Sequence, residues 1–111
     1  MIINDERKET ISKAILFIHN LREEVYILGT NKYGLALTKW LDYKNIKVSG
    51  FINDFVDESA FGGLPIVNSN ADFSDKAIIN CIVEGRTIDA DNNTKKCNPK
   101  KSIDYFALTT N

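Results

Sequence analysis

The chain has 111 residues, of which 43% are hydrophobic and 26% are charged. These proportions are ordinary for a globular protein and exclude disordered, collagen-like and coiled-coil classes. Basic and acidic residues number 14 and 15, for a net charge of −1. That balance argues against nucleic-acid and membrane-surface binding, because both need a concentrated basic face. The length allows one domain with a single core.

The N-terminal stretch MIINDERKET is polar and contains acids, so it predicts neither a signal peptide nor a membrane span. Cys81 and Cys97 form no CxxC motif, and His19 is the sole histidine, which leaves too few ligands for a zinc site. Cys81 lies in the apolar run AIINCIVEG and is predicted to be a buried small hydrophobic residue. We therefore expect a protein of the reducing cytoplasm.

Hydrophobic periodicity predicts a helix near the N-terminus. Over residues 5–22, apolar side chains recur at the i, i+3, i+4, i+7 spacing of an amphipathic helix. Asn4 is a suitable N-cap for it. We expect this helix, within residues 1–23, to pack on a domain formed by residues 24–111.

The rest of the chain alternates between strand and helix patterns. VYIL at 25–28 is a short continuous apolar run, typical of a strand covered on both faces. Helical spacing from Tyr33 to Lys44 predicts a helix that ends at Asn45. Residues 86–97 are polar and fit either a thin helix or a loop. Further strands are predicted at 47–54, at 64–67 as a short piece within the loop 58–69, at 76–85 and at 102–109.

This alternation predicts parallel strands joined by right-handed crossovers. We expect an α/β fold, a small Rossmann-like doubly wound parallel sheet in the order of about 3-2-1-4-5, with the first strand at its centre. Ligands of such sheets bind outside the carboxyl ends of the strands, where the strand order reverses. Here that crevice is predicted between the first and fourth strands.

The first segment predicted to reach the crevice is GTNKYG, from Gly29 to Gly34. Gly29 permits a tight turn off the strand, and Gly34 lets the helix approach the sheet closely. Both tasks also fit a turn that serves packing alone. Asn31 occupies the position of the middle glycine of the dinucleotide fingerprint, and its side chain argues against a tightly cradled dinucleotide. Thr30 and Asn31 are candidate hydrogen-bond partners of a ligand, and the helix N-terminus favours an anion.

The second segment follows the fourth strand and consists of Glu84, Gly85, Arg86 and Thr87. Arg86 is a candidate for a charge-assisted contact with a phosphate, and Thr87 for a further hydrogen bond. Asn53 ends the second strand at the position where an acid would hold a ribose hydroxyl, with Asp54 beside it. The alternative for Asp54 is a turn residue. No Ser-His-Asp grouping or activated nucleophile is recognisable, so the sequence indicates a binding pocket rather than a reactive one.

The stretch VYILGTNKYGLALTKWLDYKNIKVSGFIND (25–54) resembles the opening Rossmann-like module attached to FkbM-type sugar methyltransferases and related nucleotide-sugar-processing enzymes. GLPIV (63–67), CIVEGR (81–86) and DYFAL (104–108) match the places of that module's short strand, fourth strand and last strand. The resemblance thus extends over residues 24–108. A similar opening occurs in the N-terminal domain of bacterial sugar O- and N-acyltransferases, where it helps to hold a nucleotide sugar.

The resemblance implies a non-catalytic module that binds a nucleotide or nucleotide sugar, within a larger methyltransferase-type enzyme of surface polysaccharide biosynthesis. Asn31 and Asn53 replace the two residues of the motif most tied to nucleotide contact, so a ligand-free scaffold or dimerisation domain is the alternative. S-adenosylmethionine would require a second domain, which 111 residues cannot contain. The partners expected are a small phosphate-bearing ligand, together with a second copy or an attached catalytic domain.

Overall fold

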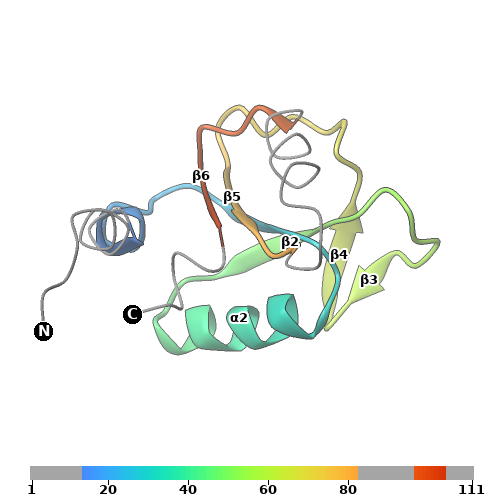
Figure 1. The fold of residues 1–111 in the computed structure, drawn as a ribbon, viewed down its shortest axis with the longest axis horizontal. Coiled ribbons are helices and arrows are strands. Elements are labelled where there is room, and N and C mark those ends of the chain that lie inside the picture. The colour runs from blue at the N-terminus through green and yellow to red at the C-terminus, as the bar shows by residue number, and fades with distance from the viewer. Residues whose placement is uncertain (1–13, 83–96, 105–111) are drawn as a thin grey trace, which may run out of the picture.

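The computed structural model describes residues 14–82 and 97–104. Its centre is a six-stranded sheet in the order β3-β4-β2-β1-β5-β6 (Figure 1). Neighbouring strands run parallel except for β3 and β4, which are antiparallel. This confirms a mixed α/β fold with a mostly parallel sheet. The strands are β1 Val25–Leu28, β2 Val48–Ile52, β3 Ala60–Phe61, β4 Leu64–Val67, β5 Ala77–Asn80 and β6 Lys101–Asp104.

The central strands are buried on both faces. β1 pairs with β2 on one side and with β5 on the other, and Val25, Ile27 and Leu28 are all buried. This placement explains why β1 is a continuous apolar run rather than an alternating one. β5 is buried along its whole length for the same reason.

The helix α2, Lys32–Tyr43, covers one face of the sheet. Leu37 and Leu41 are buried, whereas Trp40, which shares the predicted spacing, is 39% exposed. The ammonium group of Lys44 lies 5.2 Å from the centre of the Trp40 ring. Asn45 has a φ of 62°, the left-handed conformation that ends many helices, and this confirms the stop predicted there.

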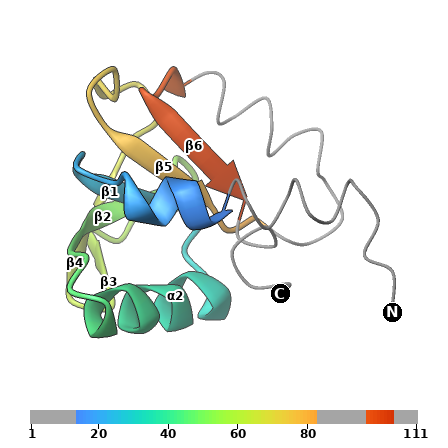
Figure 2. The same ribbon diagram turned by 90° about the vertical axis from the view of Figure 1, so that its left-hand side faces the viewer.

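Two apolar clusters lie on opposite faces of the sheet. The cluster beneath α2 also receives Ala14, Phe17 and Ile18 from the helical residues 14–19, which lie on the same side as α2 (Figure 2). The second cluster forms around Leu28, Ile52, Phe73, Ile78 and Cys97. In the described parts of the chain, this face of the sheet is covered by Phe73, in the loop before β5, and by Cys97.

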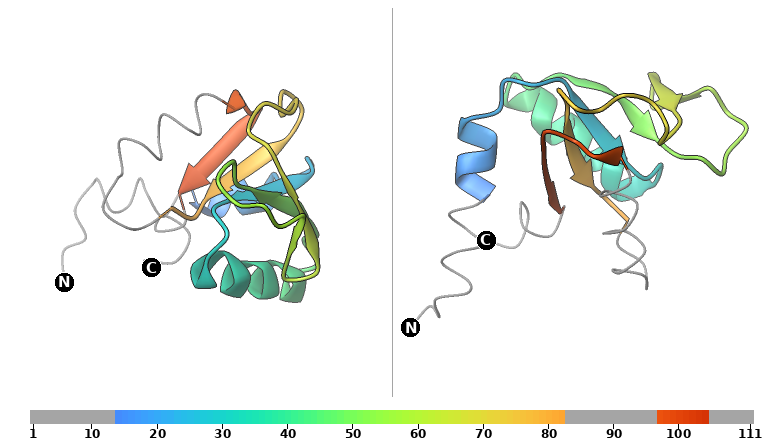
Figure 3. Two further views of the ribbon diagram at one scale, coloured as in Figure 1. Left: turned by 90° about the vertical axis from the view of Figure 1, so that its right-hand side faces the viewer. Right: turned by 90° about the horizontal axis from the view of Figure 1, so that it is seen from above.

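Several predicted bounds differ from the structure. Within the described residues, the strands predicted at 47–54 and 76–85 end earlier, at Ile52 and Asn80, although the N–H groups of Asn53 and Cys81 still donate to the carbonyls of Val67 and Leu28. β3 was not predicted, since its two residues carry no periodicity. It pairs with β4 through a turn in which Gly62 and Gly63 take φ values of 58° and 82°, which glycine adopts without strain. This hairpin lies at the opposite edge of the sheet from β6 (Figure 3).

Parts of some predicted elements lie outside the described residues. These parts are residues 1–13 of the expected N-terminal helix, residues 83–85 of the strand predicted at 76–85, residues 86–96 of the polar segment and residues 105–109 of the last predicted strand.

Ion pairs gather at the amino ends of β1, β5 and β6. Glu23, whose side chain is 9% exposed, pairs with Lys100 at 3.3 Å and with Lys101 at 3.1 Å. Lys76 pairs with Glu24 at 3.2 Å. These contacts connect the segment that leads into β1 to the segments that begin β5 and β6.

Candidate functional site

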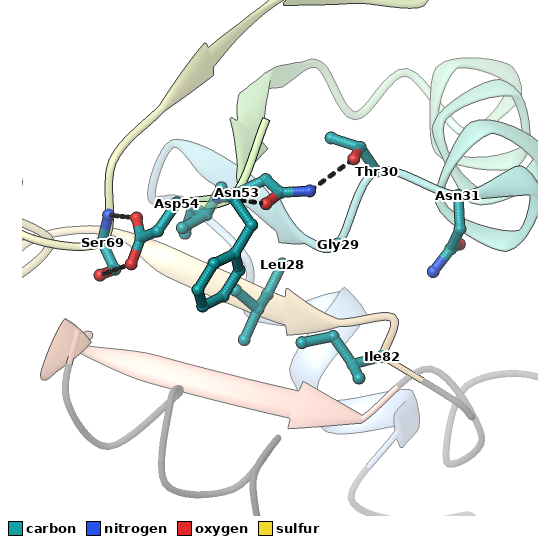
Figure 4. A pocket seen from close by; sticks show the side chains of 10 residues that line it. Leu28, Gly29, Thr30, Asn31, Asn53, Asp54, Ser69 and Ile82 are labelled. Atoms are coloured by element: carbon teal, nitrogen blue, oxygen red, sulfur yellow. Dashed lines mark hydrogen bonds between the residues drawn. The ribbon is translucent and has the colours of Figure 1, made fainter. Parts of the chain in front are cut away.

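A hollow of about 250 Å³ opens over the carboxyl ends of the central strands (Figure 4). Its volume is just below the range of about 300–1,000 Å³ that is usual for small-molecule pockets. The hollow extends from the end of β2 across β1 to the residues after β5. The crevice was predicted between the strands that are now β1 and β5, so the hollow is shifted from that place toward β2. It is lined by Leu28, Gly29, Thr30, Asn31, Ile52, Asn53, Asp54, Phe55, Ser69 and Ile82.

Asn31 joins the start of α2 to the end of β5. Its Oδ1 accepts a hydrogen bond from the backbone N–H of Gly34 at 2.9 Å, which makes Asn31 the N-cap of α2. Its Nδ2 donates to the carbonyl of Cys81, also at 2.9 Å. The backbone of Asn31 is extended, with φ −140° and ψ 177°, as N-cap residues usually are. The asparagine in place of the fingerprint glycine therefore has a structural task in this chain.

Thr30 and Asn53 bridge the ends of β1 and β2. Asn53 Nδ2 donates to Thr30 Oγ1 at 2.7 Å, and Asn53 Oδ1 accepts from the backbone N–H of Phe55 at 2.9 Å. The Asn53 amide is thereby oriented by one backbone donor and one hydroxyl acceptor. Both side chains line the hollow.

Asp54 bridges β2 to the residues after β4. Its Oδ1 accepts from the backbone N–H of Ser69 at 2.7 Å, and its Oδ2 accepts from the Ser69 hydroxyl. Ser69 is buried whereas Asp54 is exposed. The carboxylate thus holds the loop after β4 against the end of β2, and it faces the hollow from its rim (Figure 4).

Asn80 and Asp104 make the corresponding contact between β5 and β6. Asn80 is buried, its Nδ2 donates to Asp104 Oδ1 at 3.0 Å, and its Oδ1 accepts from the N–H of Ile82 at 3.1 Å. Every neighbouring pair of parallel strands is therefore bridged by a side chain at its carboxyl end. We call this set the polar row: Asp54–Ser69, Asn53–Thr30, Asn31–Cys81 and Asn80–Asp104.

The two glycines predicted to shape the turn are under tight geometric limits. Gly29 has a φ of 111°, a conformation that side chains rarely adopt. A Cβ at Gly34 would lie 3.1 Å from the Gly29 carbonyl oxygen and 3.2 Å from the Phe51 ring. The close approach of the helix to the sheet at Gly34 is thus observed.

Five of the predicted site residues line the same hollow: Gly29, Thr30, Asn31, Asn53 and Asp54. Gly34 does not line it and lies buried in the first turn of α2. The second predicted segment, Glu84, Gly85, Arg86 and Thr87, lies outside the described residues.

Sequence reasoning missed the apolar walls of the hollow, Leu28, Ile52, Phe55 and Ile82, and also Ser69. Leu28 and Ile52 are the final residues of β1 and β2, so strand ends alone would have identified them. Phe55 is 92% exposed, and its place directly after the FIND motif was the available signal. Ser69 follows β4 in the chain and could be found only through the strand order.

The charges around the hollow are few. Among the described lining residues, Asp54 is the one ionisable side chain, and no lysine, arginine or histidine is present. Burial raises the pKa of the neighbouring Cys81 thiol to about 12, so this sulfur stays protonated and is a poor nucleophile. In the described parts of the chain, no cluster of His, Cys, Asp and Glu could hold a metal ion.

Comparisons with protein-family models, with curated proteins and with solved structures returned no match for this chain. A search of the described residues for a helix long and apolar enough to span a membrane found none.

Proposed function

We propose that this chain is a non-catalytic module that binds a nucleotide sugar at the hollow over the carboxyl ends of β1 and β2, within a larger sugar-modifying transferase. The observation that carries the proposal is the convergence of predicted site residues from separate segments, Gly29 to Asn31 and Asn53 to Asp54, on one hollow. Its place at the carboxyl edge of a mostly parallel sheet is the usual ligand position in such folds.

The proposal includes a Rossmann-like, doubly wound arrangement and a cytoplasmic location. The first is supported by the parallel strands with β1 at their centre. The second is supported by the free, buried Cys81 and Cys97, which suit a reducing compartment.

Apolar walls and polar edges support the nucleotide-sugar class. Leu28, Ile52 and Ile82 offer an apolar floor, and Phe55 offers an exposed aromatic ring at the same hollow. Thr30 and Asn53 contribute neutral polar groups. A ligand with one ring-shaped apolar surface and several polar edges fits such a lining.

Calorimetric titration with UDP-, GDP- and dTDP-sugars tests the proposal directly. At least one of them should bind with a dissociation constant in the micromolar to millimolar range. Arg86→Ala should weaken that binding, because the sequence predicts a phosphate contact there. Arg22→Ala, which removes the same charge from an exposed residue between the N-terminal helical segment and β1, is the matched control. No heat and no chemical-shift change at millimolar ligand would reject the proposal.

A ligand-free dimerisation module is the second candidate, and exposed apolar residues favour it. Tyr43 and Trp40 on α2 are 85% and 39% exposed, and Ile15 and Leu16 are 60% and 57% exposed. Sedimentation equilibrium at high micromolar concentration tests this candidate. A dimer that Tyr43→Glu dissociates would support it, and a strict monomer would exclude it.

A further inference from the structure

Phe55 is the most exposed of the large apolar side chains in the part of the chain that the structure describes. It is 92% exposed, and it lines the hollow. The other exposed side chains of this kind lie on helical segments and outside the lining of the hollow: Ile15, Leu16, Trp40 and Tyr43. A single exposed apolar residue is ordinary on a protein surface. The position of Phe55 at the hollow is therefore what distinguishes it.

Contacts within the protein hold the backbone that presents the Phe55 ring. The N–H of Phe55 donates to Asn53 Oδ1 at 2.9 Å, and Asn53 Nδ2 donates to Thr30 Oγ1 at 2.7 Å (Figure 4). Asp54, between Asn53 and Phe55 in the chain, accepts from the backbone and the hydroxyl of Ser69. The start of this loop is thus tied to the residues after β1 and after β4. A ligand that covers the ring has only the side chain to order, which lowers the cost of binding.

The rest of the lining favours an uncharged ring with apolar faces over a phosphate or a sugar. Leu28, Ile52 and Ile82 form the apolar part of the lining, and they cannot hydrogen-bond the hydroxyl groups that surround a hexose. A phosphate in the hollow would meet the Asp54 carboxylate with no cation among the described lining residues, and like charges repel. The volume of about 250 Å³ equals that of about eight liquid water molecules, which is space for one ring and its substituents.

We infer that the hollow holds the base of the bound nucleotide, and that Phe55 stacks on that base. This inference rests on the proposed function and names the part of the ligand that the hollow recognises. Every nucleobase has a π face, so stacking on an aromatic side chain contributes affinity whichever base is present. The sugar and the phosphates then lie outside the hollow. The aromatic ring of Phe55, rather than a charged group of the lining, is the main source of affinity there.

The experiment compares nucleotides with a sugar phosphate that has no base, by NMR titration of the whole chain. The ligands are UMP, GMP, dTMP and glucose 1-phosphate, each of which carries one phosphate. We expect at least one of the nucleotides to bind about tenfold more tightly than glucose 1-phosphate. Phe55→Ala should weaken nucleotide binding by about tenfold, whereas Phe55→Trp keeps a π face and should retain it. The urea midpoint of Phe55→Ala should equal that of the unaltered chain, because the ring is exposed.

Tyr43→Ala is the matched control, since it removes an aromatic ring that is 85% exposed on α2 and lies outside the lining of the hollow. This variant should bind nucleotides as the unaltered chain does. The control separates stacking at the hollow from a general loss of exposed aromatic surface.

The outcomes separate the inference from the proposed function. Nucleotide affinity that is unchanged in Phe55→Ala, or glucose 1-phosphate binding as tightly as the nucleotides, would overturn the inference while leaving nucleotide-sugar binding intact. Binding of a nucleotide sugar without binding of any of the three nucleotides would do the same. Failure of every nucleotide and nucleotide sugar to bind would overturn both.

Discussion

Asn31 and Cys81 connect the ends of two parallel strands that are far apart in the chain. The Asn31 Nδ2 donates to the Cys81 carbonyl at 2.9 Å, and the same asparagine caps α2 through Gly34. One side chain thus fixes the turn after β1, the first turn of the helix and the exit of β5. The position that the fingerprint would give to a pyrophosphate-facing glycine serves here to hold these three segments together.

The Asn31 contacts can be separated by two substitutions. Asn31→Ala removes both hydrogen bonds and should lower the free energy of unfolding by about 2 kcal/mol. Asn31→Asp keeps the acceptor for the Gly34 N–H but loses the donor to Cys81, so it should be less destabilising than alanine. Urea unfolding followed by circular dichroism measures both. If Asn31→Asp is as stable as the unaltered chain, the bond to Cys81 contributes nothing.

The buried Asn80 offers a second test of the polar row. Asn80→Ala leaves the Ile82 N–H and the Asp104 carboxylate without this partner, and should cost about 2 kcal/mol of stability. Asp104→Asn keeps an oxygen that accepts from Asn80 Nδ2, so it should have a much smaller effect. Equal losses in the two variants would show that the charge of Asp104, rather than the bridge, matters to the fold.

Glu23 should make stability depend on acid pH. Its bonds to the backbone N–H of Arg22 and to the Lys101 side chain lower its pKa from the ordinary 4.5 to about 2. A depressed carboxyl pKa contributes stability above the unfolded value, and that contribution is lost as pH falls from about 4.5 toward 2. Urea midpoints should therefore be higher for the unaltered chain than for Glu23→Gln at pH 6, and this difference should shrink at pH 3.

A control for this pH effect is Glu58→Gln, which removes the same charge from an exposed loop. The control should follow the unaltered chain at both pH values. A difference between Glu23→Gln and the unaltered chain that stays constant from pH 6 to pH 3 would contradict the assignment of the effect to the Glu23 carboxylate.

Cys81 should resist alkylation in the native protein. Burial raises its pKa to about 12, so at pH 8 only about one thiol in ten thousand is ionised. Cys97→Ala leaves Cys81 as the single thiol to be measured. Iodoacetamide should label this variant slowly in buffer and quickly in urea. Rapid labelling in buffer would show that the end of β5 opens readily.

Local patterns were sufficient to predict much of the fold. The apolar run of VYIL gave β1, and the spacing of Leu37 and Leu41 gave the buried face of α2. Gly29 and Gly34 were predicted to shape the turn, and the geometry at both agrees with that prediction. These features depend on neighbours in the chain, so the sequence carries them directly.

The contacts of the polar row depend on residues that are distant in the chain, and the sequence did not reveal them. Asn31 was interpreted as a damaged nucleotide motif, because its partner Cys81 is reached only through the strand order. Asp54 presented the same difficulty, since Ser69 follows a different strand. Trp40 keeps the same helical spacing as the buried Leu37 and Leu41, but it is 39% exposed.

The short hairpin strand β3 limits how copies of this protein can associate through their sheets. Its antiparallel pairing occupies the outer edge of β4, which leaves β6 as the outermost strand on the opposite side. β3 is now the outermost strand on its side, but it is only two residues long, and a very short edge strand offers little backbone for pairing with another chain. The hairpin thus protects the longer strand β4 from pairing with the sheet of a second copy.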